Sequence, residues 1–169
     1  AFIKSNGSLW TVGQNYSGRL GDGTTTHRNT PIRVMDGNVT KVAVWEHTLF
    51  LMNDGSLWGM GRNVEGQLGI DLNTNQMAPI RIVDSNVTHF APGLRHTLFL
   101  KSDGSLWGMG SNDYGQLGNG TFQASLVPVQ VIENGVVDVA CGNDFSMIKM
   151  SNGQIKVFGN DSSGQLGIG

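Results

Sequence analysis

The side chains best suited to chemistry in this sequence are four histidines: His27, His47, His89 and His96. His47 and His96 occupy the same position of an internal repeat, and Phe145 stands at that position in the next copy. A phenyl ring can fill the same space as an imidazole, but it cannot carry a proton or bind a metal. We therefore expect this position to be structural, opening a strand. The other two histidines have no acid or nucleophile beside them.

Other residues with reactive or metal-ligating groups also lack the neighbouring residues that catalysis or metal binding requires. Asp71, Asn73 and Asn75 place oxygens at alternate residues, as in a calcium-binding turn, but the glycine and distal glutamate of an EF-hand are missing. Cys141 follows Val139 and Ala140, which indicates a buried thiol and not a nucleophile. We predict no catalytic residues, no metal site and no cofactor, and we expect the protein not to be an enzyme.

The dominant feature of the sequence is a repeat. Asp103-Gly104-Ser105-Leu106-Trp107 is followed by Gly115-Gln116-Leu117-Gly118, which we call the corner motif. Similar sequences surround Gly7, Gly55 and Gly153. The four starting glycines are 48, 49 and 49 residues apart, and each precedes its Gly-x-Leu-Gly corner by 11 residues. A fixed period of this length is typical of proteins built from repeated supersecondary units.

Each repeat contains four short runs that are typical of β-strands. In the unit that starts at Pro79 these runs are 79–83, 87–91, 97–101 and 105–109. Turn residues separate them, so we predict an all-β fold of four-stranded antiparallel sheets. The chain would then hold fourteen strands, or about three and a half units. We divide the single segment 1–169 into a half unit at 1–23 and units at approximately 24–71, 72–120 and 121–169.

The corner motif is expected to join neighbouring sheets. We predict that its leucines fill apolar gaps between sheets, while the flanking glycines allow sharp turns; the leucines are Leu20, Leu68, Leu117 and Leu166. An asparagine precedes the corner in three copies and suits left-handed or Asx-turn geometry; the residues are Asn15, Asn63 and Asn112, with Asp161 in the fourth copy.

Composition narrows the classes of partner. Eleven Lys and Arg against thirteen Asp and Glu give a formal net charge of −2, without a run of like charge. A nucleic-acid interface would require clustered basic residues, so we predict no nucleic-acid partner. We also expect no membrane partner, because no apolar run is long enough to cross a bilayer. The sequence begins inside a repeat and without Met, and we interpret it as a segment of a longer protein or a processed product.

The segment Val87 to Gly118 carries a pattern that resembles the repeat of the regulator of chromosome condensation family. The resemblance extends over the whole chain and implies a β-propeller, in which each four-stranded sheet is one blade around a central channel. Propellers of this family usually have seven blades, so the chain corresponds to a partial propeller. We expect the missing blades to come from a longer parent chain or from self-association with a second copy, whose strands would bring the total to seven blades.

The resemblance implies several functions. The family includes a guanine-nucleotide exchange factor for a small nuclear GTPase that binds chromatin, and a bacterial protein that inhibits β-lactamase. The absence of a basic tail or patch argues against the chromatin-binding regulator. We predict a non-catalytic protein–protein interaction module that presents variable loops to a protein partner. Two alternatives stay open, namely exchange or chromatin regulation, and a sensor or substrate-binding domain attached to an enzyme.

Candidate contact residues are those that differ between copies, because loops on a repeated framework usually carry recognition. One group lies between the second and third runs of each unit and comprises Trp45, Glu46, Leu94, Arg95, Asn143 and Asp144. A second group precedes the glycine corner and comprises Tyr16, Arg62, Glu65 and Tyr114. Trp45 interrupts the repeat pattern, and we expect its side chain to be exposed.

Overall fold

The computed structural model describes residues 1–168, which form an all-β chain of fourteen strands and one short 3-10 turn, η1 (Tyr16–Gly18). The first sheet contains β1 (Phe2–Ile3), β2 (Leu9–Gly13) and β3 (Arg28–Met35). The second contains β4 (Val39–Val44), β5 (His47–Met52), β6 (Leu57–Gly61) and β7 (Gln76–Val83). The third contains β8 (Val87–Pro92), β9 (His96–Lys101), β10 (Leu106–Gly110) and β11 (Ser125–Ile132). The fourth contains β12 (Val136–Cys141), β13 (Phe145–Met150) and β14 (Ile155–Gly159).

Every sheet is an antiparallel meander, as expected, but the predicted grouping of strands within each unit is wrong. The proline-containing strand closes a sheet instead of opening one: β7 pairs with β6, and β11 pairs with β10. The expected boundaries near 24, 72 and 121 therefore fall within sheets. The reason is that each long connection folds into a compact corner, which returns the chain to the strand that it has just left. The chain crosses to the next sheet in the short turn that follows.

The prolines lie where a missing N–H costs least. Pro31, Pro79 and Pro128 are each the fourth residue of an outer strand, next to an irregularity in its pairing. In the second sheet, for example, the register shifts between Gly59 and Gly61 of the neighbouring strand. Edge strands and bulges are the positions that tolerate proline in a sheet.

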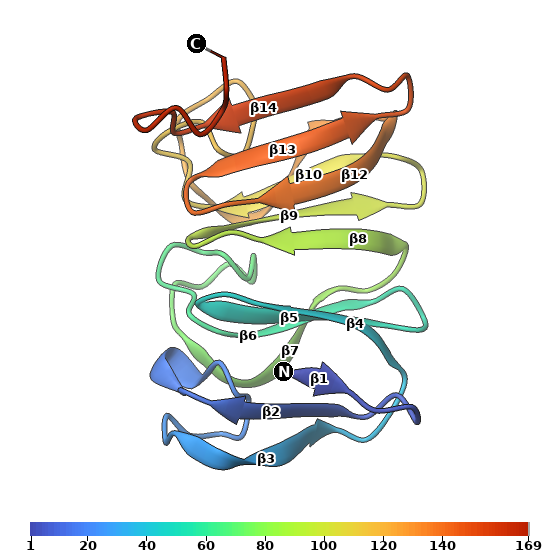
Figure 1. Cartoon of the computed structure of the whole chain (residues 1–169), viewed down its shortest axis with the longest axis vertical. Coiled ribbons are helices and arrows are strands. Elements are labelled where there is room, and N and C mark those ends of the chain that lie inside the picture. The colour runs from blue at the N-terminus through green and yellow to red at the C-terminus, as the bar shows by residue number, and fades with distance from the viewer. Residues whose placement is uncertain (169) are drawn as a thin grey trace.

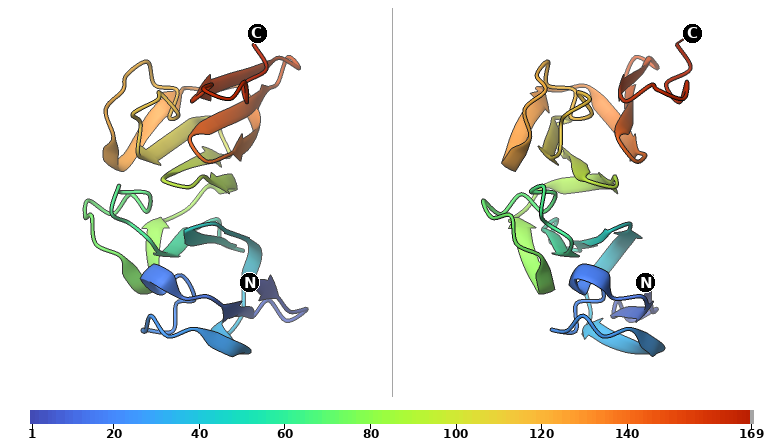
Figure 2. Two further views of the ribbon diagram at one scale, coloured as in Figure 1. Left: turned by 60° about the vertical axis from the view of Figure 1, so that its left-hand side comes forward. Right: turned by 90° about the vertical axis from the view of Figure 1, so that its left-hand side faces the viewer.

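The four sheets follow one another in chain order along the long axis of the molecule (Figures 1 and 2). A cluster of apolar side chains fills the space between each consecutive pair of sheets. The corner leucines take part as predicted: Leu68 packs with Phe99 and Met109 of the following sheet, and Leu117 packs with Ile148. Both leucines are fully buried and Leu20 is also buried, whereas Leu166 of the last described blade is only half-buried. The sheets therefore stack as blades, and the corner of one blade fills the space against the next.

The two ends of the strands differ. At one end, on the right in Figure 1, tight turns join the strands, and hydrogen bonds link these turns from sheet to sheet. The Val87 N–H donates to Gly55 O at 3.0 Å, and the Val136 N–H donates to Gly104 O at 3.1 Å. At the other end lie the long connections and the loops between the first two strands of each four-stranded sheet. We call these two ends the turn face and the loop face.

Candidate protein-interaction face

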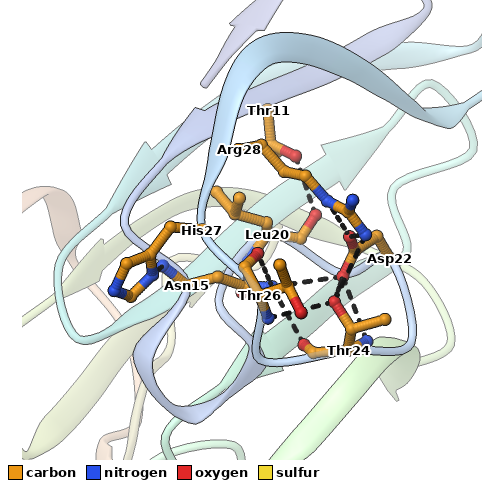
Figure 3. Close-up of polar contacts among 8 residues, drawn as sticks. All are labelled: Thr11, Asn15, Leu20, Asp22, Thr24, Thr26, His27 and Arg28. Atoms are coloured by element: carbon orange, nitrogen blue, oxygen red, sulfur yellow. Dashed lines mark hydrogen bonds and ion pairs between the residues drawn. The ribbon is translucent and has the colours of Figure 1, made fainter.

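A buried asparagine organises each long connection of the loop face. The Asn15 carboxamide accepts a hydrogen bond from the Leu20 N–H at 2.8 Å and donates to the carbonyl of Thr24 at 2.9 Å (Figure 3). It also donates to Asp22 Oδ1 at 3.1 Å, and Asp22 in turn pairs with Arg28. One side chain thus fixes both the corner leucine and the loop beyond it, so that the loop is held as a defined shape.

The same arrangement recurs in the other copies. Asn63 Oδ1 accepts from the Leu68 N–H at 2.8 Å, and Asn112 Oδ1 accepts from the Leu117 N–H at 2.9 Å. Asp161 takes the same role toward the Leu166 N–H. The prediction of a left-handed or Asx-turn residue was wrong, because the contact reaches five residues along the chain and none of the three asparagines has a positive φ. Full burial explains why an amide with several partners is required here.

His47 and His96 are fully buried and link successive blades. His47 Nε2 lies 2.8 Å from Thr97 Oγ1 of the next sheet, and this hydroxyl donates to the carbonyl of Gln67 at 2.8 Å. The relation is repeated one blade further on, where His96 Nε2 contacts Ser146 Oγ and this hydroxyl donates to Gln116 O. We call these two chains of hydrogen bonds the histidine relay. It joins the start of a strand, the next blade and the corner motif.

The relay fixes the protonation state of its rings. The Thr97 hydroxyl donates its proton to the Gln67 carbonyl, so it can only accept a hydrogen bond from His47. The neutral imidazole of His47 must therefore carry its proton on Nε2, and its Nδ1 carries none. Burial, reinforced by the nearby His96, lowers the pKa of His47 to about 3. Burial also lowers the pKa of His96 to about 4, although Asp144 opposes this shift. Both rings are neutral near pH 7, which fits the structural role expected for this repeat position.

The predicted contact residues lie on the loop face, and five of the ten form ion pairs. Arg62 pairs with Glu65 at 2.7 Å, and Arg95 of one blade pairs with Asp144 of the next at 3.0 Å. Glu46 pairs with Arg19 at 3.1 Å. Burial alone would raise the pKa of Glu65, but hydrogen bonds from Arg62 and Gln67 hold it below its usual value. The charges alternate along the face, so the surface is polar without a dominant sign.

Sequence reasoning missed Arg19 as a member of this surface. Its guanidinium also donates to the carbonyl of Trp45 at 3.2 Å and lies 5.8 Å from the Tyr16 ring. A signal was present, because Arg19 stands where the other three corner motifs have glutamine. Arg19, a residue of the corner motif, thus connects the variable residues of two successive loops.

Four of the residues line one shallow pocket: Glu46, Arg62, Leu94 and Arg95. Asn143 approaches it through its carbonyl, which accepts from the Leu94 N–H at 3.2 Å. Trp45 is 44% exposed, as predicted, and Tyr16 and Tyr114 are 55% and 47% exposed. Within residues 1–168, the Tyr114 side chain forms no hydrogen bond or aromatic pair with the other predicted residues. The structure therefore assembles nine of the ten residues and leaves Tyr114 apart.

The remaining reactive groups are engaged elsewhere. The Asn75 carboxamide accepts from the Asn63 N–H at 3.0 Å, so this oxygen of the proposed calcium turn supports the loop instead. Burial raises the pKa of the Cys141 thiol to about 12. Residues 1–168 contain no group of three or more His, Cys, Asp or Glu side chains placed to hold a metal ion. No helix in that range is long and apolar enough to cross a membrane.

Comparison with solved structures supports the propeller architecture. Human WBSCR16 shares 25% identity with this chain at a TM-score of 0.82, and the match covers 93% of this chain and 44% of WBSCR16. Yeast RCC1 (Prp20) bound to Kap60 is similar at 21% identity and a TM-score of 0.85, with 99% and 43% of the two chains covered. Prp20p from Saccharomyces cerevisiae gives 24% identity, a TM-score of 0.84 and the same coverage. The chain thus spans less than half the length of these proteins.

No curated protein sequence matches the chain significantly. The model of the regulator of chromosome condensation (RCC1) repeat, however, matches residues 6–51, 54–100 and 103–148, and a second model of this repeat matches residues 87–116 and 136–165. Together with the stacked four-stranded sheets and the repeated corner, these matches establish the family. The chain belongs to the RCC1 repeat family and forms about three and a half blades of a β-propeller.

Proposed function

We propose that this propeller segment is a non-catalytic protein-interaction module, and that its loop face contacts the partner. One observation carries the proposal. The residues that vary between the repeats converge on one face, where Glu46, Arg62, Leu94 and Arg95 share a pocket. The turn face, in contrast, repeats nearly the same turns and the same backbone hydrogen bonds from blade to blade.

The loop face has the composition of a recognition surface. Trp45, Tyr16 and Tyr114 are half-exposed, and the side chains of Arg95 and Arg62 are partly accessible. Aromatic residues and arginine contribute most of the binding energy in many protein interfaces. The buried asparagines and the histidine relay hold the loops in place, which reduces the entropy lost on binding.

The relatives favour a protein partner. One of these structures shows yeast RCC1 (Prp20) bound to Kap60. The other is the structure of Prp20p, a protein that binds Gsp1p and histones. Nucleotide exchange on a small GTPase is therefore the second candidate for this chain. An exchange factor would accelerate the release of a fluorescent GDP analogue from such a GTPase, and the interaction module proposed here would not.

The decisive experiment is affinity capture with the whole chain from an extract of the organism that encodes it, with the captured protein identified by mass spectrometry and then purified. Calorimetry should give saturable binding to the wild-type chain and a loss of at least about tenfold, or 1.4 kcal/mol, for Trp45→Ala combined with Arg95→Ala. The matched control combines Arg81→Ala with Glu133→Ala, which changes an ion-paired arginine and an acid away from the loop face. Equal losses in both double variants would contradict a binding site on the loop face.

Self-association is a separate proposal, and the apolar end faces of the blade stack support it. Phe2 and Met147 are each 39% exposed, whereas their repeat equivalents Phe50, Phe99, Leu49 and Leu98 are fully buried between blades. A second copy could bury both ends. Light scattering during size-exclusion chromatography should then show a mass that rises with concentration, and a monomer at every concentration would refute it.

A further inference from the structure

The loop-face pocket lies between the second and third sheets, and its lining differs from the same positions at the next interface. Its four lining residues are Glu46, Arg62, Leu94 and Arg95. One blade further on, the equivalent positions carry Arg95, Ser111, Asn143 and Asp144. Both sheets that form the pocket are complete, with four strands each. Two arginines and a leucine therefore come together at this interface, and no such set stands at the equivalent positions of the next one.

The two arginines of the pocket have their own acids outside it. Arg62 donates to Glu65 from Nε at 3.1 Å and from Nη2 at 2.7 Å. Arg95 donates to Asp144 from Nη2 at 3.0 Å. Neither Glu65 nor Asp144 lines the pocket, and within residues 1–168 the Nη1 group of each arginine forms no hydrogen bond. About a third of each arginine side chain is exposed, so donors are accessible to a further acceptor.

The charges of the lining favour a negative group. Hydrogen bonds to Glu65 raise the pKa of Arg62, whereas the nearby charge of Arg95 opposes this rise. The two guanidinium groups are thus close enough to repel each other. Glu46 is the single carboxylate among the four lining residues, and its Oε2 already pairs with Arg19 at 3.1 Å. A carboxylate placed between Arg62 and Arg95 would reduce the repulsion between them.

The size and walls of the pocket favour one side chain over a free small molecule. Its volume of about 270 Å³ is slightly below the range of about 300–1,000 Å³ that is usual for small-molecule sites. Leu94 forms an apolar wall, and the half-exposed Trp45 is next to Glu46 in the chain. The space therefore suits an acidic side chain that has an apolar residue beside it.

A carboxylate fits this surroundings better than a phosphate group does. The guanidinium group presents N–H donors in a planar fork that matches the two oxygens of a carboxylate. A phosphate group carries a charge of about −1.5 to −2. The acids around the pocket disfavour this larger charge more strongly; they are Glu46, Glu65 and Asp144.

We propose that the pocket anchors an Asp or Glu side chain of the partner protein, with an apolar residue adjacent to it. The carboxylate accepts hydrogen bonds from Arg62 and Arg95, and the apolar neighbour contacts Leu94. The inference rests on the loop-face interaction proposed above and defines the chemistry of the partner at this point of the face.

The first test is a titration of the wild-type chain with the capped tripeptide acetyl-Leu-Glu-Leu-amide. In ¹H–¹⁵N spectra, the Nε–H signals of Arg62 and Arg95 should shift and saturate, with a Kd on the order of 1–10 mM. The signals of Arg33 and Arg81, which pair with Asp36 and Asp84, should not move. The neutral peptide acetyl-Leu-Gln-Leu-amide should bind at least about fivefold more weakly. This measurement does not depend on the folding of any variant.

Variants of the chain provide the second test. Arg62→Gln and Arg95→Gln should each weaken binding of the Glu peptide at least about fivefold, to the level of the Gln peptide. Arg81→Gln is the matched control, because this arginine is also ion-paired but lies away from the loop face, and it should leave binding unchanged. The backbone amide spectrum of each variant shows whether the fold is retained.

Three results would overturn the proposal: no saturable shift up to ~20 mM peptide, equal binding of the Glu and Gln peptides, or tighter binding of a phosphoserine peptide. These results are distinct from failure of the proposed function. If affinity capture finds no partner while the Glu peptide binds at Arg62 and Arg95, the carboxylate site is supported and the interaction module is not. If a partner binds the loop face while the two peptides behave alike, the interaction module stands and the carboxylate site is refuted.

Discussion

The two interior sheets and the two terminal sheets place equivalent residues in different surroundings. Leu98 of the third sheet is fully buried, whereas Met147 at the same repeat position of the fourth sheet is 39% exposed. Phe50 and Phe99 are fully buried, and Phe2 is 39% exposed. Since the residue types are alike, the difference comes from the neighbouring blade. A position in this framework contributes to stability to the extent that a following or preceding blade covers it.

The polar contacts between blades show the same contrast. His47 and His96 each reach a hydroxyl of the next sheet, and that hydroxyl bonds to the corner motif. In the fourth sheet Phe145 replaces the histidine and cannot donate such a bond. The relay thus operates across the interior interfaces and stops at the last described blade.

The largest expected difference in stability is between alanine substitutions at Leu98 and at Met147. Leu98→Ala should lower the free energy of unfolding by about 2–5 kcal/mol, because it removes buried methyl groups and leaves a cavity. Met147→Ala should cost less than about 1 kcal/mol, because the side chain is already partly in water. Urea unfolding followed by tryptophan fluorescence measures both. Similar losses at the two positions would show that a further contact covers the terminal face in solution.

A corner glycine gives the next comparison. Gly69 and Gly167 both have φ of +64°, but a Cβ at Gly69 would collide with Met109 Sδ, whereas nothing lies within 4 Å of the same atom at Gly167. Gly167→Ala should cost about 1–2 kcal/mol from the backbone alone. Gly69→Ala should cost about 1–3 kcal/mol more, because a packed core cannot easily accept an extra group. Urea unfolding measures the loss of unfolding free energy in both variants. Equal losses would contradict the close approach between blades at Gly69.

The histidine relay should make Thr97 more important than Thr48. Thr97→Val leaves both the Nε2–H of His47 and the carbonyl of Gln67 unpaired in a buried site, which should cost about 2–3 kcal/mol. Thr48→Val removes only the bond to the Arg19 carbonyl and should cost about 1 kcal/mol. Chemical denaturation of the two isosteric variants provides the measurement. A larger loss for Thr48→Val would refute the two-partner role of Thr97.

The last comparison concerns the dependence of stability on pH. The pKa of His96 is about 4 in the folded chain against 6.5 in the unfolded chain, so the unfolded state binds the extra proton first as pH falls. Stability should therefore be complete above pH 6.5 and should decrease toward pH 4, with His47 and His96 each contributing a loss of about 2 kcal/mol at pH 5.

The His96→Phe variant, which copies the residue found at Phe145, isolates this effect. It should remove about half of the decrease between pH 6.5 and 4.5. Melting temperatures of the variant and the wild-type chain across this range provide the measurement. An unaltered profile for His96→Phe would show that His96 is not a neutral buried ring.

Repetition in the sequence was sufficient to predict the all-β class, the fourteen strands, the burial of three of the four corner leucines and the exposure of Trp45. These features depend on local periodicity, on turn residues and on departures from the repeat pattern, all of which can be read along the chain. The candidate loops could also be found, because they are the places where the copies differ.

The tertiary structure alone decided which strands share a sheet. Pro79 can begin a unit in the sequence, but β7 pairs with β6 because the long connection folds back on itself around Asn63. The relay from His47 to Thr97 and the pair of Arg95 with Asp144 also span about fifty residues, from one blade to the next. Local patterns determine the strands and turns of each repeat, whereas these contacts depend on how successive repeats stack, since each joins groups that meet only after the blades have packed.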